Sequence, residues 1–217
     1  MAAFQYQALD AAGMDAPPAT FDELAAMAEA LEGTGTQVFA DGGLQGWNIF
    51  PWIWSAGGQV SDDDLTTATG YLDGPASVEA VQLLVDLYEA GQIPNLIIGN
   101  EGATSTSDGL PSGDYATILD GPWMRDIWSG QFPDFTPIYA PVPAGDGGSV
   151  SVVGGESIVM MSSSPHQEAA MKFIEFTQSR EYQLGMAAVG QMTVVQEFGQ
   201  EDEIDQFYAV FAEQLET

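Results

Sequence analysis

Residues 110–123 of this 217-residue chain read Leu-Pro-Ser-Gly-Asp-Tyr-Ala-Thr-Ile-Leu-Asp-Gly-Pro-Trp. The Pro, Ser and Gly of residues 110–114 favour a turn. The apolar, partly β-branched run Tyr115–Leu119 predicts a short buried strand. The break that follows delivers Trp123 at the carboxyl end of this strand, where ligands of open α/β sheets bind. Trp123 is therefore a candidate stacking surface for a ligand, with packing in the core as the alternative.

Helices and short strands alternate on both sides of this stretch. Thr20 with Glu23 forms the pattern of a capping box at a helix start, and the aromatic run 47–56 places four bulky side chains on one helical face. This alternation predicts the α/β class, as one domain over residues 1–217 with a central sheet flanked by helices. The predicted helices are 4–12, 20–32, 47–56, 75–90, 124–128, 165–176, 180–188 and 203–216. The predicted strands are 37–40, 71–72, 115–119, 135–142 and 157–161.

The composition limits the possible chemistry. Hydrophobic residues make up 45% of the chain, which is enough for a sizeable core. The absence of cysteine excludes disulfides, thiolate metal sites and cysteine nucleophiles. No apolar run approaches the roughly 20 residues of a membrane-spanning helix. The first residues show neither the basic segment nor the apolar run of a signal peptide.

The charge is strongly one-sided. Three basic residues face 32 acidic ones, for a formal net charge of −29. Nucleic-acid binding is excluded, because it requires Lys and Arg to neutralise phosphates. The acidic residues are scattered, a distribution that suits a surface in high salt, apart from a short cluster at residues 62–64. A calcium site at this cluster is an alternative, although the cluster lacks the spaced ligands and central Gly of a calcium loop.

The charge leads to a prediction about stability. We expect the fold to melt at a higher temperature in about 1 M potassium chloride than in dilute buffer, because a Debye length of about 3 Å screens the repulsion among carboxylates. Thermal unfolding followed by circular dichroism across a salt series measures this shift. Equal melting temperatures at low and high salt would show that the acidic surface does not oppose folding.

The sequence carries no recognisable catalytic motif. The single histidine, His166, follows Pro165 at a predicted helix start and is interpreted as a surface residue. No nucleophile elbow, phosphate-binding loop or zinc-protease motif occurs. No catalytic residue, metal or cofactor is therefore expected. An acidic enzyme of the glycosidase type remains an alternative, because pairs of carboxylates exist in such an acidic chain.

Several motifs in a fixed order resemble one family. They are the helix start at residues 16–24, the aromatic helix ending in Gly-Gly at 50–58, the Ser-Gly to Gly-Pro-Trp stretch at 112–123, and the closing motifs at 139–143, 154–155 and 162–181. Together they resemble the extracellular solute-binding proteins of ABC importers, in the sugar-binding, maltose-binding-protein-like group. One departure is the stretch 191–193, where the family often has a Pro and this chain has Gln-Met-Thr.

The resemblance implies a role and partners. Members have two lobes around a cleft, and this chain is similar mainly to the second lobe, so the resemblance implies one periplasmic-binding-protein-like lobe over residues 1–217. The implied partners are a small polar solute, most simply a sugar, the membrane permease of an ABC transporter, and the missing first lobe. The implied location is extracellular, at the cell surface or in the periplasm. The alternative is a truncated lobe that acts as a structural or interaction domain without tight ligand binding.

The resemblance also implies a set of ligand-binding residues. Trp123 matches the family's stacking aromatic, and Trp47 matches an aromatic at the start of the cleft-facing helix. Gly155 and Glu156 lie where the second lobe offers backbone and side-chain groups to the ligand. Arg125 is a candidate hydrogen-bond donor, with pairing to a neighbouring acid as its alternative role. Sugars suit such a set, because their C–H faces pack on aromatic rings and their hydroxyls need polar partners.

Overall fold

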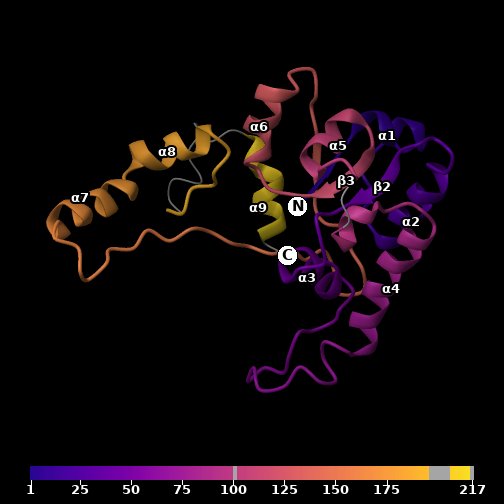
Figure 1. The fold of residues 1–217 in the computed structure, drawn as a ribbon, viewed down its shortest axis with the longest axis horizontal. Coiled ribbons are helices and arrows are strands. Elements are labelled where there is room, and N and C mark those ends of the chain that lie inside the picture. The colour runs from indigo at the N-terminus through magenta and orange to yellow at the C-terminus, as the bar shows by residue number, and fades with distance from the viewer. Residues whose placement is uncertain (100–101, 196–205, 216–217) are drawn as a thin grey trace.

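The structure, a computed structural model, describes residues 1–99, 102–195 and 206–215 (Figure 1). Its centre is a four-stranded sheet in the order β2-β3-β1-β4, which confirms the predicted α/β class. The strands β2 and β3 are parallel, and β1 is antiparallel to both β3 and β4. The carboxyl ends of β2, β3 and β4 therefore meet at one edge of the sheet. The strands are β1 (Ala2–Phe4), β2 (Gln37–Ala40), β3 (Tyr115–Leu119) and β4 (Ile138–Ala140).

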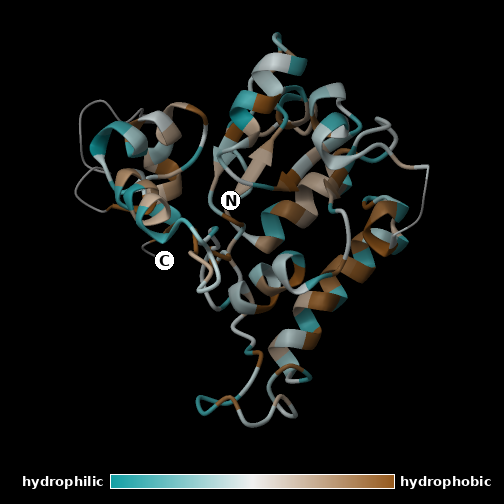
Figure 2. Ribbon diagram, turned by 60° about the vertical axis from the view of Figure 1, so that its left-hand side comes forward, coloured by the Kyte–Doolittle hydropathy of each residue, from teal (hydrophilic) through white to brown (hydrophobic). Residues whose placement is uncertain are grey.

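The helices cover both faces of this sheet. Side chains alternate across it, so that Ala2 and Phe4 of β1 join a larger core while Ala3 joins a smaller one. Figure 2 shows the strands between the helices that flank them. The described helices are α1 (Tyr6–Ala11), α2 (Phe21–Ala30), α3 (Gly46–Ser55), α4 (Pro75–Glu89), η1 (Asn95–Ile98), α5 (Thr106–Ser112), α6 (Met124–Gln131), α7 (Gln167–Thr177), α8 (Arg180–Ala188), η3 (Gln206–Tyr208) and α9 (Ala209–Leu215).

The predicted capping box at the start of α2 is present. The Thr20 hydroxyl oxygen accepts a hydrogen bond from the backbone N–H of Glu23 at 3.2 Å. The Glu23 carboxylate reaches back and accepts from the backbone N–H of Ala19 at 2.6 Å. Two backbone donors at the helix end are satisfied in this way, so the local sequence accounts for where α2 begins.

The helices α7 and α8 stand away from the sheet (Figure 1). We call residues 164–195 the helical arm, and residues 1–150 with 206–215 the sheet body. An extended run, residues 151–163, leads from the body to the arm, and α9 lies back against the body. There the Gln214 side chain accepts from Val142 N at 2.8 Å and donates to Ser149 O at 3.0 Å. The arm is thus an excursion between two segments of the body.

Three local predictions of helix or strand are wrong in whole or in part. Phe4 was expected in a helix, yet it ends β1, the strand between β3 and β4, and the helix starts at Tyr6 behind a Gln5 side-chain cap. The apolar triplet Ala2–Phe4 is too short for its period to separate strand from helix, so strand pairing decides. Residues 71–72 form a turn rather than a strand, and the strand expected at 135–142 is confined to residues 138–140, between Pro137 and Pro141.

The predicted turn at residues 110–114 is also wrong in part, because residues 106–112 form α5 and only Gly113 turns, with φ of +85°. Pro111 lies inside this helix and lacks the N–H that would bond to the carbonyl of Ser107. The indole N–H of Trp128 in α6 donates to that carbonyl at 2.7 Å. A tertiary contact therefore satisfies the group that Pro111 leaves open.

The predictions for the extended run and α7 fail for a shared reason. Residues 157–161 were expected as a buried strand, but they form no strand and Val159 is 72% exposed. Phe173 and Phe176 of α7 were expected to face inward, but they are 53% and 45% exposed. A strand and an apolar helical face are stable only against a partner surface. Within the described residues no strand pairs with residues 157–161, and the contact of the Phe176 ring with the Tyr182 ring of α8, 5.6 Å between ring centres, still leaves Phe176 largely exposed. The helix predicted at 203–216 is α9 in its described part, and residues 203–205 and 216 lie outside the described residues.

Candidate ligand-binding cleft

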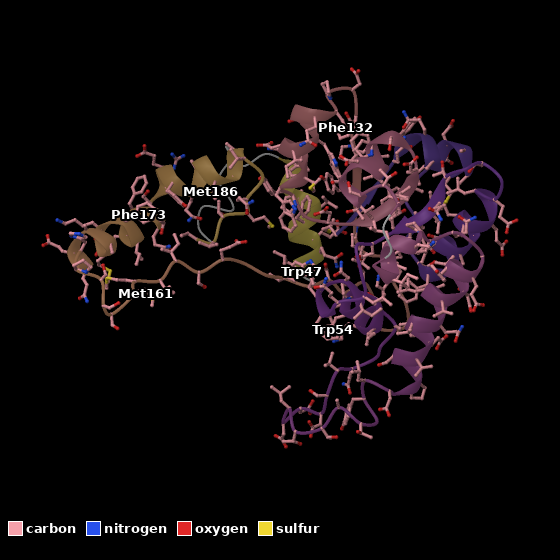
Figure 3. The ribbon with its side chains drawn as sticks, in the orientation of Figure 1. Trp47, Trp54, Phe132, Met161, Phe173 and Met186 are labelled. Carbon is pink, nitrogen blue, oxygen red and sulfur yellow. The ribbon has the colours of Figure 1, made fainter. Side chains whose placement is uncertain are left out.

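A cleft of about 1060 Å³ lies between the sheet body and the helical arm. This volume is at the upper end of the roughly 300–1,000 Å³ typical of small-molecule sites. The body contributes the carboxyl end of β3, the start of α3 and part of α9, and the arm contributes α7, α8 and the segment after α8. Figure 3 shows Trp47 on the body side and Met186 on the arm side, and both residues line the cleft.

Trp47 lies in the first turn of α3 and is 53% exposed. A Cβ placed on Gly154 would lie 2.6 Å from its ring, closer than any real contact. Gly154 is in the extended run between body and arm, so only a residue without a side chain lets this run pass over the indole. Trp47 thus presents a flat apolar surface to the cleft and supports the segment that crosses it.

Trp123 lies between β3 and α6 and is 38% exposed, whereas Trp128, one turn further on, is 1% exposed. Its ring folds over Gly121, where a Cβ would lie 2.1 Å from the ring. The neighbouring Asp120 carboxylate accepts a hydrogen bond from the backbone N–H of Gly121 at 2.8 Å. The placement favours a ligand-stacking role for Trp123, and Trp128 has the core-packing role.

Two carboxylates follow the parallel strands. Asp41 comes directly after β2, is 4% exposed, and accepts hydrogen bonds from the Asn48 side chain and from the backbone N–H groups of Gly42 and Gly43. Burial, with a smaller contribution from the Asp120 carboxylate, raises the pKa of Asp41 to about 7. Burial also raises the pKa of Asp120, against the hydrogen bond from the Gly121 backbone N–H. Asn48 and Asp120 themselves line the cleft.

The structure brings four of the five sequence-predicted site residues together. Trp47, Trp123, Gly155 and Glu156 line the one cleft. Arg125 does not line it. Its guanidinium lies 4.3 Å from the Phe207 ring centre and 3.7 Å from the Asp126 carboxylate, which matches the alternative of pairing with an acid.

Sequence reasoning missed the arm side of the cleft. Asn48 follows Trp47 directly on the first turn of α3. Its position next to a predicted site residue could have identified it from the sequence. No local signal marks the arm residues, since they reach the cleft only through the tertiary placement of α7 and α8. The arm residues that line the cleft and carry polar or large side chains are Ile174, Thr177, Gln178, Tyr182, Gln183, Met186, Gln191, Met192 and Thr193.

The cleft combines aromatic rings, amides and carboxylates. Its charged side chains within the described lining are Asp120 and Glu156. Across residues 1–99, 102–195 and 206–215, no group of three or more His, Cys, Asp or Glu is placed to hold a metal ion. At the sequence-predicted calcium alternative, the Asp62 carboxylate accepts hydrogen bonds from Thr66 and Thr67. Flat apolar surfaces beside hydrogen-bonding groups suit a polar ligand with apolar faces.

No helix in the described part of the chain has the length and apolar character needed to cross a bilayer.

Solved structures share the fold. The chain superposes on the GacH receptor of Streptomyces glaucescens, solved unliganded and with acarbose, with a TM-score of 0.83 and 22% identity. It superposes on the maltose-bound MalE3 of T. maritima with a TM-score of 0.81 and 24% identity. The alignments cover 99% of this chain but 56% and 57% of those chains. Most of this chain therefore has the architecture of part of such a protein.

Curated relatives are more distant in sequence. Proteins of Brucella abortus (strain 2308) and Brucella suis biovar 1 (strain 1330), assigned to the binding proteins, are each 26% identical over 177 residues. This match covers 76% of the chain and 41% of each relative, so the chain spans about two-fifths of their length. The profile of the bacterial extracellular solute-binding proteins matches residues 3–184. This is most of the chain, and the relatives are substrate-binding proteins rather than enzymes. The chain belongs to the bacterial extracellular solute-binding protein family.

Proposed function

We propose that this chain is the substrate-binding component of an ABC importer and binds a carbohydrate or a similar polar solute. The observation that carries the proposal is that Trp47 and Trp123 are both exposed in the same cleft, beside amide and carboxylate groups. Sugar rings have apolar C–H faces that pack on indoles, and their hydroxyls need donors and acceptors. Asn48 on the body side, Glu156 in the extended run and Gln178 on the arm side supply such groups. The acarbose- and maltose-bound neighbours are consistent with this solute class.

The proposal includes a further lobe as a partner. Val153, Val159 and Met161 in the extended run are strongly exposed, as are Phe173 and Phe176 of α7. Figure 3 shows Met161 and Phe173 near the end of the molecule away from the sheet. A surface that groups apolar side chains in this way is typical of an interface. The longer chains of the relatives leave room for a lobe that covers it. In this proposal, the binding protein works outside the cytoplasm and delivers its solute to a membrane permease.

The same observation favours a second candidate function. A chain that exposes these apolar residues is suited to association, so it is also a candidate interaction domain that holds its partner lobe without binding a ligand tightly. The two candidates differ in whether the cleft binds a solute when the chain is alone.

A titration of the 217-residue chain with maltose separates the candidates. We expect weak binding, with a dissociation constant of about 1 mM or higher, corresponding to about −4 kcal/mol or weaker, because the cleft is open and part of the contacts are absent. Equilibrium dialysis with labelled maltose, supported by tryptophan fluorescence, measures this. Glucose and an uncharged polyol such as mannitol serve as comparators. A chain that retains none of these solutes at concentrations well above 1 mM would favour the interaction domain.

A further inference from the structure

The helical arm meets the sheet body at the carboxyl end of α8, which points toward α6 and α9 in Figure 1. Gly190, the second residue after α8, is buried and has φ of +87°. A Cβ placed on it would lie 2.8 Å from the Pro122 carbonyl oxygen and 2.9 Å from the Trp123 Cα. Both atoms belong to the backbone, so neither can turn aside as the end of a side chain could. Only glycine therefore lets the arm come this close to the body.

A tyrosine of the body holds the same end of α8. The Tyr208 hydroxyl donates to the Ala187 carbonyl at 2.5 Å, and this carbonyl also accepts from the backbone N–H of Gly190 at 3.2 Å. Tyr208 and Ala187 are each 6% exposed. Water does not easily replace a hydrogen bond that is buried in this way, and an unpaired buried hydroxyl is costly. The arm is thus bonded to the body three positions before its contact with Trp123.

The segment that carries Tyr208 is fixed on the body. Tyr139 of β4 contacts the Phe207 ring edge-on, with 5.2 Å between ring centres, and the Phe211 ring at 5.1 Å. The side chain of Gln214 bonds to the body as described above. Tyr208 is therefore a fixed point of the body that reaches the arm.

The arm is also tied together internally. The Gln183 side chain in α8 is 4% exposed and donates to the Thr177 carbonyl at the end of α7 at 2.7 Å. Its carbonyl oxygen accepts from the backbone N–H of Val194 at 2.8 Å. This one buried amide joins α7, α8 and the segment after α8, so the arm is expected to move as a unit.

The contact between arm and body lies where the two walls of the cleft meet. Trp123 lines the cleft from the body, and Val189 and Gln191, on either side of Gly190, line it from the arm. Tyr182 lies further along the arm wall. A tilt of the arm about this contact therefore changes the distance between the arm side chains and the tryptophan rings.

We propose that the contact of Gly190 with the Pro122–Trp123 backbone, held by the Tyr208 hydroxyl, is the pivot that sets the tilt of the helical arm and the width of the cleft. Neither Gly190 nor Tyr208 lines the cleft, so both are positioning residues that act through its walls. The inference deepens the proposed function and rests on it for the binding of maltose.

A methyl group at residue 190 is large enough to move the arm. Carbon atoms in contact stay about 3.5–4.0 Å apart, so the close approach to Trp123 implies a shift of about 1 Å at the pivot. The helix α7 lies at the far end of the arm (Figure 1), where the same tilt gives a larger displacement. Binding groups must be held within about 0.5 Å of their productive geometry. The shift should therefore be visible in solute affinity.

The tilt can be measured without a ligand. The chain contains no cysteine, so two spin labels can be attached through Glu29→Cys on α2 and Glu175→Cys on α7, both exposed positions. Pulsed electron paramagnetic resonance then gives the distribution of distances between body and arm in the full 217-residue chain. In Gly190→Ala we expect the mean distance to change by about 2 Å or more, because the shift of about 1 Å at the pivot grows along the arm.

Two other glycine variants serve as controls. A Cβ on Gly185, inside α8, meets no described atom within 4 Å, so Gly185→Ala changes the same helix without touching the body. Gly91, after α4, has φ of +75°, and a Cβ there also meets no described atom. Gly91→Ala therefore introduces similar backbone strain without a clash. Both variants should keep the parent's distance. A change in either as large as that in Gly190→Ala would overturn the pivot.

A tyrosine variant tests the hydroxyl alone. Tyr208→Phe keeps the ring, which packs on Phe207 with 5.1 Å between ring centres, and removes the bond to Ala187. We expect a broader distance distribution. Tyr139→Phe is the matched control, because its buried hydroxyl has no hydrogen-bond partner in the part of the chain that the structure describes. Its distribution should equal that of the parent.

Each outcome of the distance measurements decides part of the proposal. An unchanged distance in Gly190→Ala overturns the pivot, and an unchanged distribution in Tyr208→Phe overturns the role of the hydroxyl. If Gly190→Ala does not fold, the comparison of Tyr208→Phe with Tyr139→Phe decides alone, because both variants keep the volume of the ring.

The second test uses maltose, with affinity taken from tryptophan fluorescence, since none of these variants removes a tryptophan. We expect Gly190→Ala to weaken maltose binding by about tenfold and Tyr208→Phe by about threefold. The control variants Gly185→Ala and Tyr139→Phe should bind as the parent does. A changed arm distance with unchanged maltose affinity would overturn the link between pivot and cleft. A parent chain that does not bind maltose would contradict the proposed function instead, and the label distances would still decide the pivot.

Discussion

Trp123→Ala is expected to remove maltose binding while leaving the fold largely intact. The indole is 38% exposed and lines the cleft, so its loss takes away a stacking surface rather than a filled volume of core. Truncation of a central aromatic contact typically weakens binding by about 2 kcal/mol or more, which moves a millimolar affinity beyond detection. The free energy of unfolding should fall by only about 1–2 kcal/mol, because the exposed ring fills little of the core.

Trp128→Ala is the matched control. Trp128 is five positions further along the chain, is 1% exposed, and contacts the Phe135 ring edge-on with 5.3 Å between ring centres. Its loss should lower the free energy of unfolding by about 3–5 kcal/mol. It should have little effect on maltose affinity at temperatures where the variant is folded. Both variants replace a Trp by an Ala, so their comparison separates a loss of core packing from a loss of ligand binding.

Both quantities must be measured for both variants. Urea unfolding gives the stability change, and equilibrium dialysis with labelled maltose gives the affinity, since fluorescence itself changes when a tryptophan is removed. If Trp123→Ala loses several kcal/mol of stability and binds maltose as the parent does, Trp123 is a core residue and the assignment of the cleft is wrong.

Asp41→Asn is expected to change how stability depends on pH. The pKa of Asp41 rises from 3.8 to about 7 in the folded chain, first because it is buried. The folded state therefore holds the proton more tightly than the unfolded state. The parent loses stability as pH rises from about 4 to about 7, by an amount on the order of 4 kcal/mol, and the loss levels off above that. The Asn side chain cannot ionise, so this loss should be absent from the variant.

The measurement is a series of urea unfolding curves from pH 4 to pH 8 at constant, high salt. High salt screens the repulsion among the other carboxylates, which parent and variant share. The difference between their stabilities should grow in favour of Asp41→Asn as pH rises to 7. Curves that stay parallel throughout this range would show that the Asp41 carboxyl ionises as freely in the folded chain as in the unfolded one.

Asp62→Asn provides a control of opposite sign. Hydrogen bonds from the Thr66 side chain and from the backbone of Thr67 and Thr66 lower the pKa of Asp62 below its usual value. A group of this kind contributes stability above its unfolded pKa and loses it as pH falls through the folded pKa. The parent should therefore be favoured over Asp62→Asn at neutral pH, and that advantage should disappear in unfolding curves extended below about pH 4, because the folded pKa of Asp62 lies below the usual value. Opposite trends for one type of substitution would exclude a general effect of removing a carboxylate.

Local sequence was enough wherever local physics decides the structure. The capping pair Thr20 and Glu23 sets the start of α2 through bonds within five residues. The run Tyr115–Leu119 forms β3, because apolar β-branched residues between turn signals favour a buried strand. The Asp-Gly-Pro break was likewise enough to place Trp123 beyond that strand, in the cleft. Motif order along the chain was enough to indicate the family to which the profile assigns residues 3–184.

Segments that need a distant partner were not predictable in this way. The triplet Ala2–Phe4 becomes a strand because β3 and β4 lie on either side of it. Pro111 is tolerated inside α5 because Trp128 bonds to the carbonyl left free. Residues 157–161 have the composition of a buried strand, yet they remain extended and exposed, because no described strand pairs with them.

The candidate site likewise has one part that the sequence predicted and one part that only the tertiary structure shows. Sequence alone predicted Trp47 and Trp123 on the body side and Gly155 in the extended run as cleft residues, since each belongs to a recognisable motif. Only the tertiary structure decided the arm side, including Tyr182 and Met186, and the turning of Arg125 away from the cleft toward Phe207. It also decided that Asp41 and Asp120 lie together, because their strands are neighbours in the sheet although 79 positions apart in the chain. A sequence pattern reports what a residue can do, whereas side-chain contacts across such separations depend on how the whole chain packs.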